Sequence, residues 1–155
     1  MRDIRIAAAQ FEHRDGDKAF NLDRIDHLAG LAVAAGAEVV SFHEGAITAY
    51  SFLQAATRDE LLEVAEPVPD GPSCRTLADI SARHGVPVLA GLVERDGDSI
   101  YNTYVCMTPD GLAARFRKIH AFLNPHLSSG SEYCVFDLLG CRVGILICYD
   151  NNLVE

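Results

Sequence analysis

Apolar residues along the chain form short runs that alternate with longer amphipathic segments, an order typical of strands and helices in succession. Residues 4–11 are a largely apolar run that predicts a buried strand. Residues 22–32 place apolar side chains at three- and four-residue steps before Gly36, which predicts a helix. Residues 39–42 are apolar and partly β-branched, so the three segments together predict a βαβ unit with parallel strands.

A second helix and strand follow a less regular stretch. Residues 51–66 show a weak helical pattern that the proline-rich run 67–72 ends. We expect Ser73 to cap a helix that closes at Gly85. The apolar residues 87–93 then predict another buried strand, which completes a second αβ step.

Hairpins replace crossover connections in the second half of the chain. Four strands are expected there, in two pairs separated by turn residues: 100–107 with 112–116, and 133–138 with 142–147. No repeat, low-complexity tract or linker interrupts the chain. The pattern therefore predicts an α/β fold and one domain over residues 1–155.

Composition and charge narrow the range of partners. The chain has 155 residues, is 49% hydrophobic and carries a net charge of -9, and its Lys and Arg residues are scattered, so no basic face is predicted for nucleic acid. No apolar run approaches the roughly 20 residues that span a bilayer, and the first residues do not resemble a secretory leader. We expect a cytoplasmic protein that binds neither nucleic acid nor membranes.

The five cysteines indicate neither a disulfide framework nor a zinc site. Their number is odd and no two form a C-x-x-C pair: Cys74, Cys106, Cys134, Cys141 and Cys148. Most are expected to be small core residues, because free cysteine is among the most commonly buried residue types. A redox-sensing thiol is the least favoured reading, since no resolving cysteine lies near Cys148 in the sequence.

Three chemically complementary residues follow predicted strands. Cys148 ends the apolar run 143–147, Glu44 follows 39–42, and Lys118 follows 112–116. Taken singly, the thiol could be the last packed residue of a strand, the carboxylate a solvated loop residue, and the lysine a surface residue. Together they could form a site in which a base takes the thiol proton and a cation stabilises developing negative charge.

The sequence around these residues resembles the nitrilase superfamily of carbon-nitrogen hydrolases. Glu44 lies in H-E-G-A-I-T-A-Y, Lys118 in F-R-K-I-H and Cys148 in G-I-L-I-C-Y-D, in the order of the three signature blocks of that superfamily. The opening I-R-I-A-A-A-Q-F and the segment G-S-E-Y-C-V-F-D also resemble its pattern. The resemblance covers the whole chain.

The resemblance implies an α-β-β-α sandwich and a thiol-dependent hydrolase that needs no metal or organic cofactor. Cys148 would form a thioester with the substrate, Glu44 would act as general base and Lys118 would stabilise the charged intermediate. The substrate would be a small amide or carbamoyl compound, less readily a nitrile. Homo-oligomers are common in the superfamily, so the resemblance also implies one here.

Two positions depart from the pattern of the superfamily. His43 stands where a proline commonly precedes the glutamate, and an additional glutamate of many members has no assigned counterpart, because Glu132 aligns with a different position. Four residues are candidates for binding substrate: His120, Asn124, His126 and Tyr149. Ordinary loop roles remain open for them, and the histidine spacing matches no metal-ligand motif.

The length of the chain leaves a second hypothesis open. Superfamily members are roughly twice as long, so we expect this chain to be the amino-terminal half of the sandwich, with all three proposed catalytic residues present. Sheet edges that are covered in the family would then be exposed. The alternative to a hydrolase is therefore a catalytically inactive interaction or assembly module.

Overall fold

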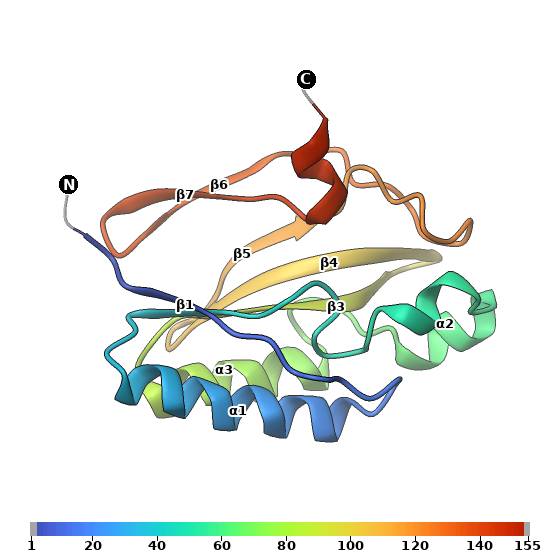
Figure 1. The fold of residues 1–155 in the computed structure, drawn as a ribbon. Helices are drawn as coiled ribbons and strands as arrows, with labels where there is room; N and C mark the ends of the chain where they lie inside the picture. The colour runs from blue at the N-terminus through green and yellow to red at the C-terminus, as the bar shows by residue number, and fades with distance from the viewer. Residues whose placement is uncertain (1–2, 154–155) are drawn as a thin grey trace.

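A five-stranded mixed sheet forms the centre of the protein, which is described here over residues 3–153 from a computed structural model (Figure 1). The strands lie side by side in chain order: β1 (Ile6–Ala8), β2 (Val39–Ser41), β3 (Val88–Asp96), β4 (Ser99–Thr108) and β5 (Gly111–Arg117). The pairs β1–β2 and β2–β3 are parallel, and the pairs β3–β4 and β4–β5 are antiparallel. The predicted βαβ unit and the first predicted hairpin are confirmed.

Two helices cover one face of this sheet. Helices α1 (Lys18–Ala34) and α3 (Pro72–His84) lie side by side against it (Figure 1), and their apolar residues, such as Ile25 and Leu77, are fully buried with those of β2 and β3. The short helices η1 (Ser51–Gln54) and α2 (Arg58–Val64) lie between β2 and α3 in the chain. Within residues 3–153, no helix has the length and hydropathy to cross a lipid bilayer.

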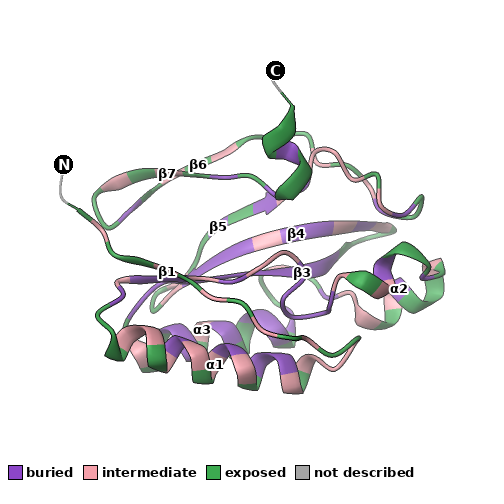
Figure 2. Cartoon of the chain, in the orientation of Figure 1, coloured by how far each residue is buried: buried purple, intermediate pink, exposed green. Residues whose placement is uncertain are grey.

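A two-stranded hairpin covers the opposite face. It consists of β6 (Cys134–Leu138) and β7 (Cys141–Ile145), paired antiparallel, and it makes a third layer above the sheet (Figure 1). Leu138 and Ile145 point inward and pack with sheet residues that include Phe116, whereas Val135 on the outer face is 58% exposed. This alternation, visible in Figure 2, confirms the predicted second hairpin and the α/β fold class.

Some boundaries differ from the prediction. The prediction that Ser73 is an N-cap was wrong: helix α3 begins at Pro72 after Gly71, because the backbone N–H and hydroxyl of Ser73 both donate to the buried carboxylate of Glu66. The weak pattern before this helix hides α2, which starts at a capping box between Thr57 and Glu60. Only three residues of the first apolar run form β1.

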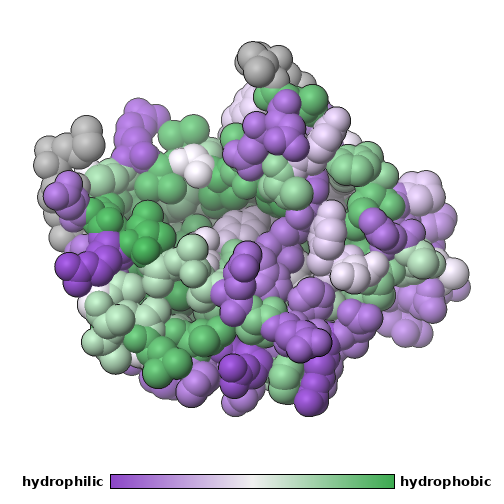
Figure 3. All heavy atoms as spheres, in the orientation of Figure 1, coloured by the Kyte–Doolittle hydropathy of each residue, from purple (hydrophilic) through white to green (hydrophobic). Residues whose placement is uncertain are grey.

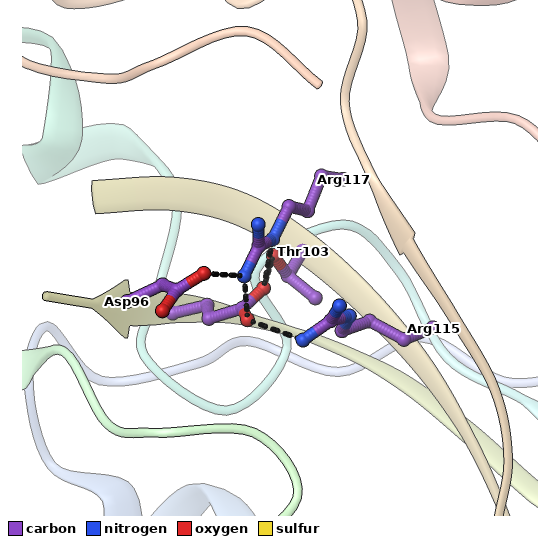
Figure 4. A network of polar contacts seen from close by, with 5 residues as sticks. Asp96, Thr103, Arg115 and Arg117 are labelled. Carbon is purple, nitrogen blue, oxygen red and sulfur yellow. Dashed lines mark hydrogen bonds and ion pairs between the residues drawn. The ribbon is translucent and has the colours of Figure 1, made fainter. Parts of the chain in front are cut away.

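A buried carboxylate ties three strands of the sheet together. Glu94 on β3 is 1% exposed and accepts hydrogen bonds from Thr103 on β4 and from Arg115 and Arg117 on β5. Arg117 donates to both carboxylate oxygens, at 2.6 and 2.9 Å, and also to Asp96 (Figure 4). These bonds with Glu94 hold the pKa of Arg117 above its ordinary value. The network fixes the register of β3, β4 and β5.

Replacing the central carboxylate should measurably destabilise the fold. We expect Glu94→Gln to lower the free energy of unfolding by about 2–3 kcal/mol, because charge-assisted hydrogen bonds are lost and the arginines, which are partly exposed, keep some solvation. Urea unfolding would measure this. Asp96→Asn is the matched control: the Asp96 side chain is 62% exposed, so the change should stay within about 0.5 kcal/mol. Equal effects of the two variants would contradict a central role for Glu94.

Candidate active site

The loop after β2 places Glu44 directly over β3. The backbone N–H of Phe42 donates to the carbonyl of Leu89, and that of Ile47 donates to the carbonyl of Gly91. The backbones approach so closely at Gly91 that an added Cβ would lie 2.4 Å from the nitrogen of Gly45. Glycine is therefore required on β3 for the loop that carries Glu44 to rest there.

Lys118 reaches the same place from the end of β5. Its backbone N–H donates to the carbonyl of Asn102, and its side chain is 2% exposed. The lysine Nζ lies 2.7 Å from Oε1 of Glu44, and the carboxylate is 14% exposed. Gly130 packs against this strand end, because its N–H donates to the carbonyl of Lys118 and a Cβ there would lie 2.2 Å from the carbonyl oxygen of Arg117. Two of the three predicted catalytic residues thus form a shielded ion pair.

A third residue, which the sequence did not indicate, completes this pair. Asn102 on β4 is buried and its Nδ2 donates to the same Oε1 of Glu44, at 2.6 Å. Both side-chain donors therefore act on one oxygen, and among the described residues Oε2 has no hydrogen-bond partner. The carboxylate is held in one orientation with one oxygen available for proton transfer.

Cys148 lies at a sharp corner after β7. Its φ of 46° is left-handed, a conformation uncommon for residues other than glycine. The side chain is exposed, unlike the buried Ile147 before it. The chain then enters η2 (Cys148–Asn152), a five-residue 3-10 helix. The corner expected from the sequence is present, and it turns the thiol out of the packed core.

Glu44 and Cys148 line one cavity of about 370 Å³ between the two sheets. Its walls come from β1, β2, β6 and β7 and from Leu89 and Tyr104, and they are mainly apolar. Figure 3 shows hydrophobic surface along the hairpin and over β1, on either side of a hollow. The ring of Tyr50 lies 6.0 Å from Nζ of Lys118, and burial, followed by the charges of Glu44 and Cys148, raises the pKa of this phenol.

His120 and Tyr149, two of the four predicted substrate-binding residues, lie near each other. The rings of His120 and Tyr149 are 6.5 Å apart, and Phe122, 64% exposed, lies between the lysine and Tyr149: its ring is 5.8 Å from Nζ of Lys118 and 4.7 Å from the ring of Tyr149. Phe122 is therefore near both the lysine and Tyr149.

Asn124 and His126 are tied to backbone groups. The Nδ2 atom of Asn124 donates to the carbonyls of Leu53 and Ala56, which leaves the buried amide no donor for a substrate. Its Oδ1 accepts from the backbone N–H of His126, at 2.8 Å. These bonds attach the loop after Lys118 to the segment around η1.

The other described thiols are less suited to nucleophilic chemistry. Cys74 and Cys106 are fully buried, and burial raises the pKa of each to about 12. Burial also raises the pKa of Cys134. Cys148 is the exposed one of the five cysteines. Among residues 3–153, no group of three or more His, Cys, Asp and Glu side chains could hold a metal ion.

Asn102, Tyr50 and Phe122 join the site without having been predicted. Asparagine is uncommon within strands, so Asn102 inside an apolar strand was a signal that a buried polar group has a specific partner. The aromatic residues carried no comparable signal, because most aromatic side chains are ordinary core residues. Their contribution depends on the loops that bring them to Lys118.

Comparison with known proteins identifies the family. Residues 5–155 match the model of the carbon-nitrogen hydrolase family. The chain belongs to this family, and hence to the nitrilase superfamily. It is 32% identical to a nitrilase of Pyrococcus abyssi over 95% of the chain and 56% of that protein, and 34% identical to an (R)-stereoselective amidase of Pseudomonas over 98% and 54%. The carbon-nitrogen hydrolase chain thus spans about half the length of these relatives.

Solved structures of the superfamily share the fold. XC1258 of Xanthomonas campestris aligns with a TM-score of 0.83 at 24% identity over 99% of this chain and 56% of its own. Nit3 of Saccharomyces cerevisiae aligns with a TM-score of 0.82 at 25% identity, over 97% and 57%. In a Glu-to-Gln mutant of the amidase from Nesterenkonia sp. AN1 (TM-score 0.77, 21% identity, 95% and 58% covered), acrylamide has added to the active-site cysteine. The three layers described above are therefore part of a nitrilase-type fold.

A methyl group at Gly91 should disturb the loop that carries Glu44. We expect Gly91→Ala to lower the free energy of unfolding by about 1–3 kcal/mol, the range for overpacking, because backbone atoms of Glu44 and Gly45 must move. Chemical denaturation would measure this. Gly144→Ala is the control, since its Cβ would meet its nearest neighbour at an ordinary 3.5 Å. A fully stable Gly91→Ala variant would contradict the close approach.

His13, whose ring lies beside that of His43 in the segment before Glu44, should make stability depend on pH. The rings of His13 and His43 are 5.3 Å apart, and Nε2 of His13 accepts from the backbone N–H of Tyr50. Burial, followed by the neighbouring His43, lowers the pKa of His13 from its ordinary 6.5. The unfolded chain therefore binds this proton at a higher pH than the folded protein does. Stability is fully present above about pH 6.5 and declines as the pH falls through the window below it.

Removing the titrating ring should reduce this decline. We expect His13→Gln, whose carbonyl can still accept from Tyr50, to flatten the fall of the urea midpoint below pH 6.5. His27→Gln on the exposed face of α1 is the control and should leave the slope as it is. An unchanged slope in His13→Gln would assign the acid sensitivity to other groups.

Proposed function

We propose that the protein is a thiol-dependent hydrolase of non-peptide carbon-nitrogen bonds, acting on small amides or carbamoyl compounds and less readily on nitriles. The observation that carries the proposal is the Glu44–Lys118 ion pair, with one carboxylate oxygen held by Lys118 and Asn102 and the exposed thiol of Cys148 on the same cavity. Family relatives include an amidase, a nitrilase and omega-amidases. We further propose that residues 1–155 contribute to one hydrolase domain.

Acylation uses all three residues. Oε2 of Glu44 takes the proton from Sγ of Cys148 as the sulfur attacks the carbonyl carbon, and the carbonyl oxygen becomes an oxyanion beside Lys118. The tetrahedral intermediate collapses when Glu44 returns the proton to the leaving nitrogen. The carbon-nitrogen bond breaks, ammonia or an amine departs, and a thioester remains on Cys148.

Deacylation repeats these roles with water as the nucleophile. Glu44 takes a proton from water as its oxygen attacks the thioester, and the sulfur then leaves as the carbon-sulfur bond breaks. The proton returns to Cys148 and the carboxylic acid is released. Asn102 has a positioning role throughout, because its hydrogen bond to Oε1 of Glu44 leaves Oε2 as the oxygen that transfers protons.

The surroundings of Lys118 strengthen its effect on the reaction. Its ammonium stays paired with Glu44 at 2.7 Å in the resting state, in a setting from which water is largely excluded. In such surroundings a fixed charge acts more strongly on a developing oxyanion than it would in water. The proposal also includes a homo-oligomeric assembly, which the resemblance implies, and a cytoplasmic location, which the sequence pattern favours.

An interaction or assembly module is the second candidate function. The specific observation in its favour is the exposed apolar outer side of the hairpin and its neighbours, where Tyr133 is 65%, Val135 58% and Leu146 47% exposed. Exposed apolar surface of this kind is typical of a surface that another protein covers. The ordered ion pair is not explained by this role, so we rank it below hydrolysis.

Acrylamide labelling and ammonia release test Cys148 and Glu44 separately. Intact-mass analysis should show an acrylamide adduct on the wild-type protein and on Glu44→Gln. In this Michael addition the sulfur bonds to the β-carbon and the α-carbon takes a proton that water can supply, so the reaction needs a presented thiol but not Glu44 as an acid. Cys148→Ala should show none. Ammonia release from primary amides should be lost in Cys148→Ala and should fall at least about 100-fold in Glu44→Gln, the usual effect of losing a general base.

Two outcomes would overturn the proposed hydrolase. One is an adduct on Cys148→Ala equal to that on the wild-type protein, which would place the reactive thiol elsewhere. The other is a protein that forms no adduct, releases no ammonia and self-associates as its concentration rises, which would favour the assembly module. Sedimentation velocity over a range of concentrations would detect the self-association.

A further inference from the structure

Asp150 joins two parts of the site that are far apart in the sequence. The residue is buried, with 7% of its surface exposed. Oδ1 accepts from the backbone N–H of His120 at 2.9 Å, and Oδ2 accepts from that of Ile147 at 3.3 Å. His120 lies two residues after Lys118, and Ile147 directly precedes Cys148. One side chain therefore bridges the lysine segment and the cysteine corner.

The same residue closes the turn that contains the thiol. The backbone N–H of Asp150 donates to the carbonyl of Ile147 at 3.0 Å, while its carboxylate accepts from the N–H of Ile147. Cys148 and Tyr149 are enclosed between these two bonds. The left-handed φ of Cys148 persists only if surrounding contacts impose it, because a cysteine side chain is strained in that conformation. The closed turn supplies such contacts.

A buried carboxylate without a cation indicates a specific role. Among residues 3–153, none of the ion pairs includes Asp150. Its charge is stabilised by backbone N–H groups alone, and burying a charge in this way is unfavourable unless the hydrogen bonds are well formed. A packing role would be met by an apolar residue without that penalty.

We propose that Asp150 is a positioning residue that holds Cys148 in register with Lys118. The inference rests on the proposed function, because it assumes that Lys118 stabilises negative charge on a group bound to Cys148. Asp150 does not touch the substrate. It acts through the backbone by keeping the His120 segment and the cysteine corner at a fixed separation, so that a carbonyl attacked by Sγ lies beside the lysine.

Possible replacements of Asp150 differ in how many hydrogen bonds they can accept. Both partners of Asp150 are N–H donors, and a carboxylate accepts from both. An asparagine has the same shape but only one acceptor atom, so its NH₂ group must face one of the two donors. Glutamate keeps both acceptors on a longer side chain. Asp150→Asn should therefore break the bridge on one side, and Asp150→Glu should restore part of it.

A double-mutant cycle tests positioning directly. The measured quantity is the rate at which Cys148 forms the Michael adduct with acrylamide, divided by the rate with methyl methanethiosulfonate. Negative charge develops on the carbonyl oxygen of acrylamide as the sulfur attacks the β-carbon, and Lys118 can stabilise it, whereas methyl methanethiosulfonate has no carbonyl. We expect Asp150→Asn to lower this ratio about tenfold, as for loss of one hydrogen bond, and Asp150→Glu to recover part of it. In a Lys118→Met background, Asp150→Asn should have almost no further effect, because the two residues act on one step.

The control and the opposing outcomes separate this inference from the proposed function. Asp137→Asn, a change of an exposed carboxylate on β6, should leave the ratio unchanged. The positioning role is wrong, and the proposed function stands, if Lys118→Met lowers the ratio but Asp150→Asn does not. The same conclusion follows if the effects of Asp150→Asn and Lys118→Met add in the double variant. If Lys118→Met has no effect, both fail. Should Asp150→Asn not fold, effects of Asp150→Glu and Lys118→Met that add in the double variant would likewise overturn positioning.

Discussion

The buried carboxylate of Glu94 is the interaction on which the geometry of this protein most depends. It accepts hydrogen bonds from β4 and β5 at once, so the three longest strands of the sheet cannot slide past one another without leaving a charge unpaired in the interior. Arg117, one of its partners, directly precedes Lys118. A slip of one residue would turn the lysine to the other face of the sheet. The network therefore sets the position of Lys118, the proposed catalytic cation.

The three proposed catalytic residues are held by three different physical means. Lys118 is held by strand register, and Glu44 by a loop that can rest on β3 only because Gly91 has no side chain. Cys148 is held by a closed turn in a left-handed conformation, with Asp150 connecting it to the lysine segment. The site lies where these arrangements meet, between the main sheet and the hairpin (Figure 1).

Much of the fold could be predicted because local patterns encode it. The apolar periodicity of α1, the turn residues between β4 and β5, and the alternation along β6 and β7 depend on neighbours a few residues away. The predictions weakened where a distant partner decides the outcome. Ser73 was predicted to cap a helix but binds Glu66, and nothing in the sequence indicated that Asn124 donates to the carbonyls of Leu53 and Ala56.

Local patterns in the chain were enough to predict most helices and strands, the family resemblance and the three residues that could carry chemistry, because strand ends and signature blocks are local features. How those three residues are placed relative to one another depends on the folded arrangement. The hydrogen bond from Asn102 to Glu44 and the bridge from Asp150 to His120 join positions 58 and 30 residues apart. Such contacts arise from strand register and close backbone packing, which depend on the whole fold, so the neighbouring sequence does not reveal which residue Asn102 or Asp150 binds.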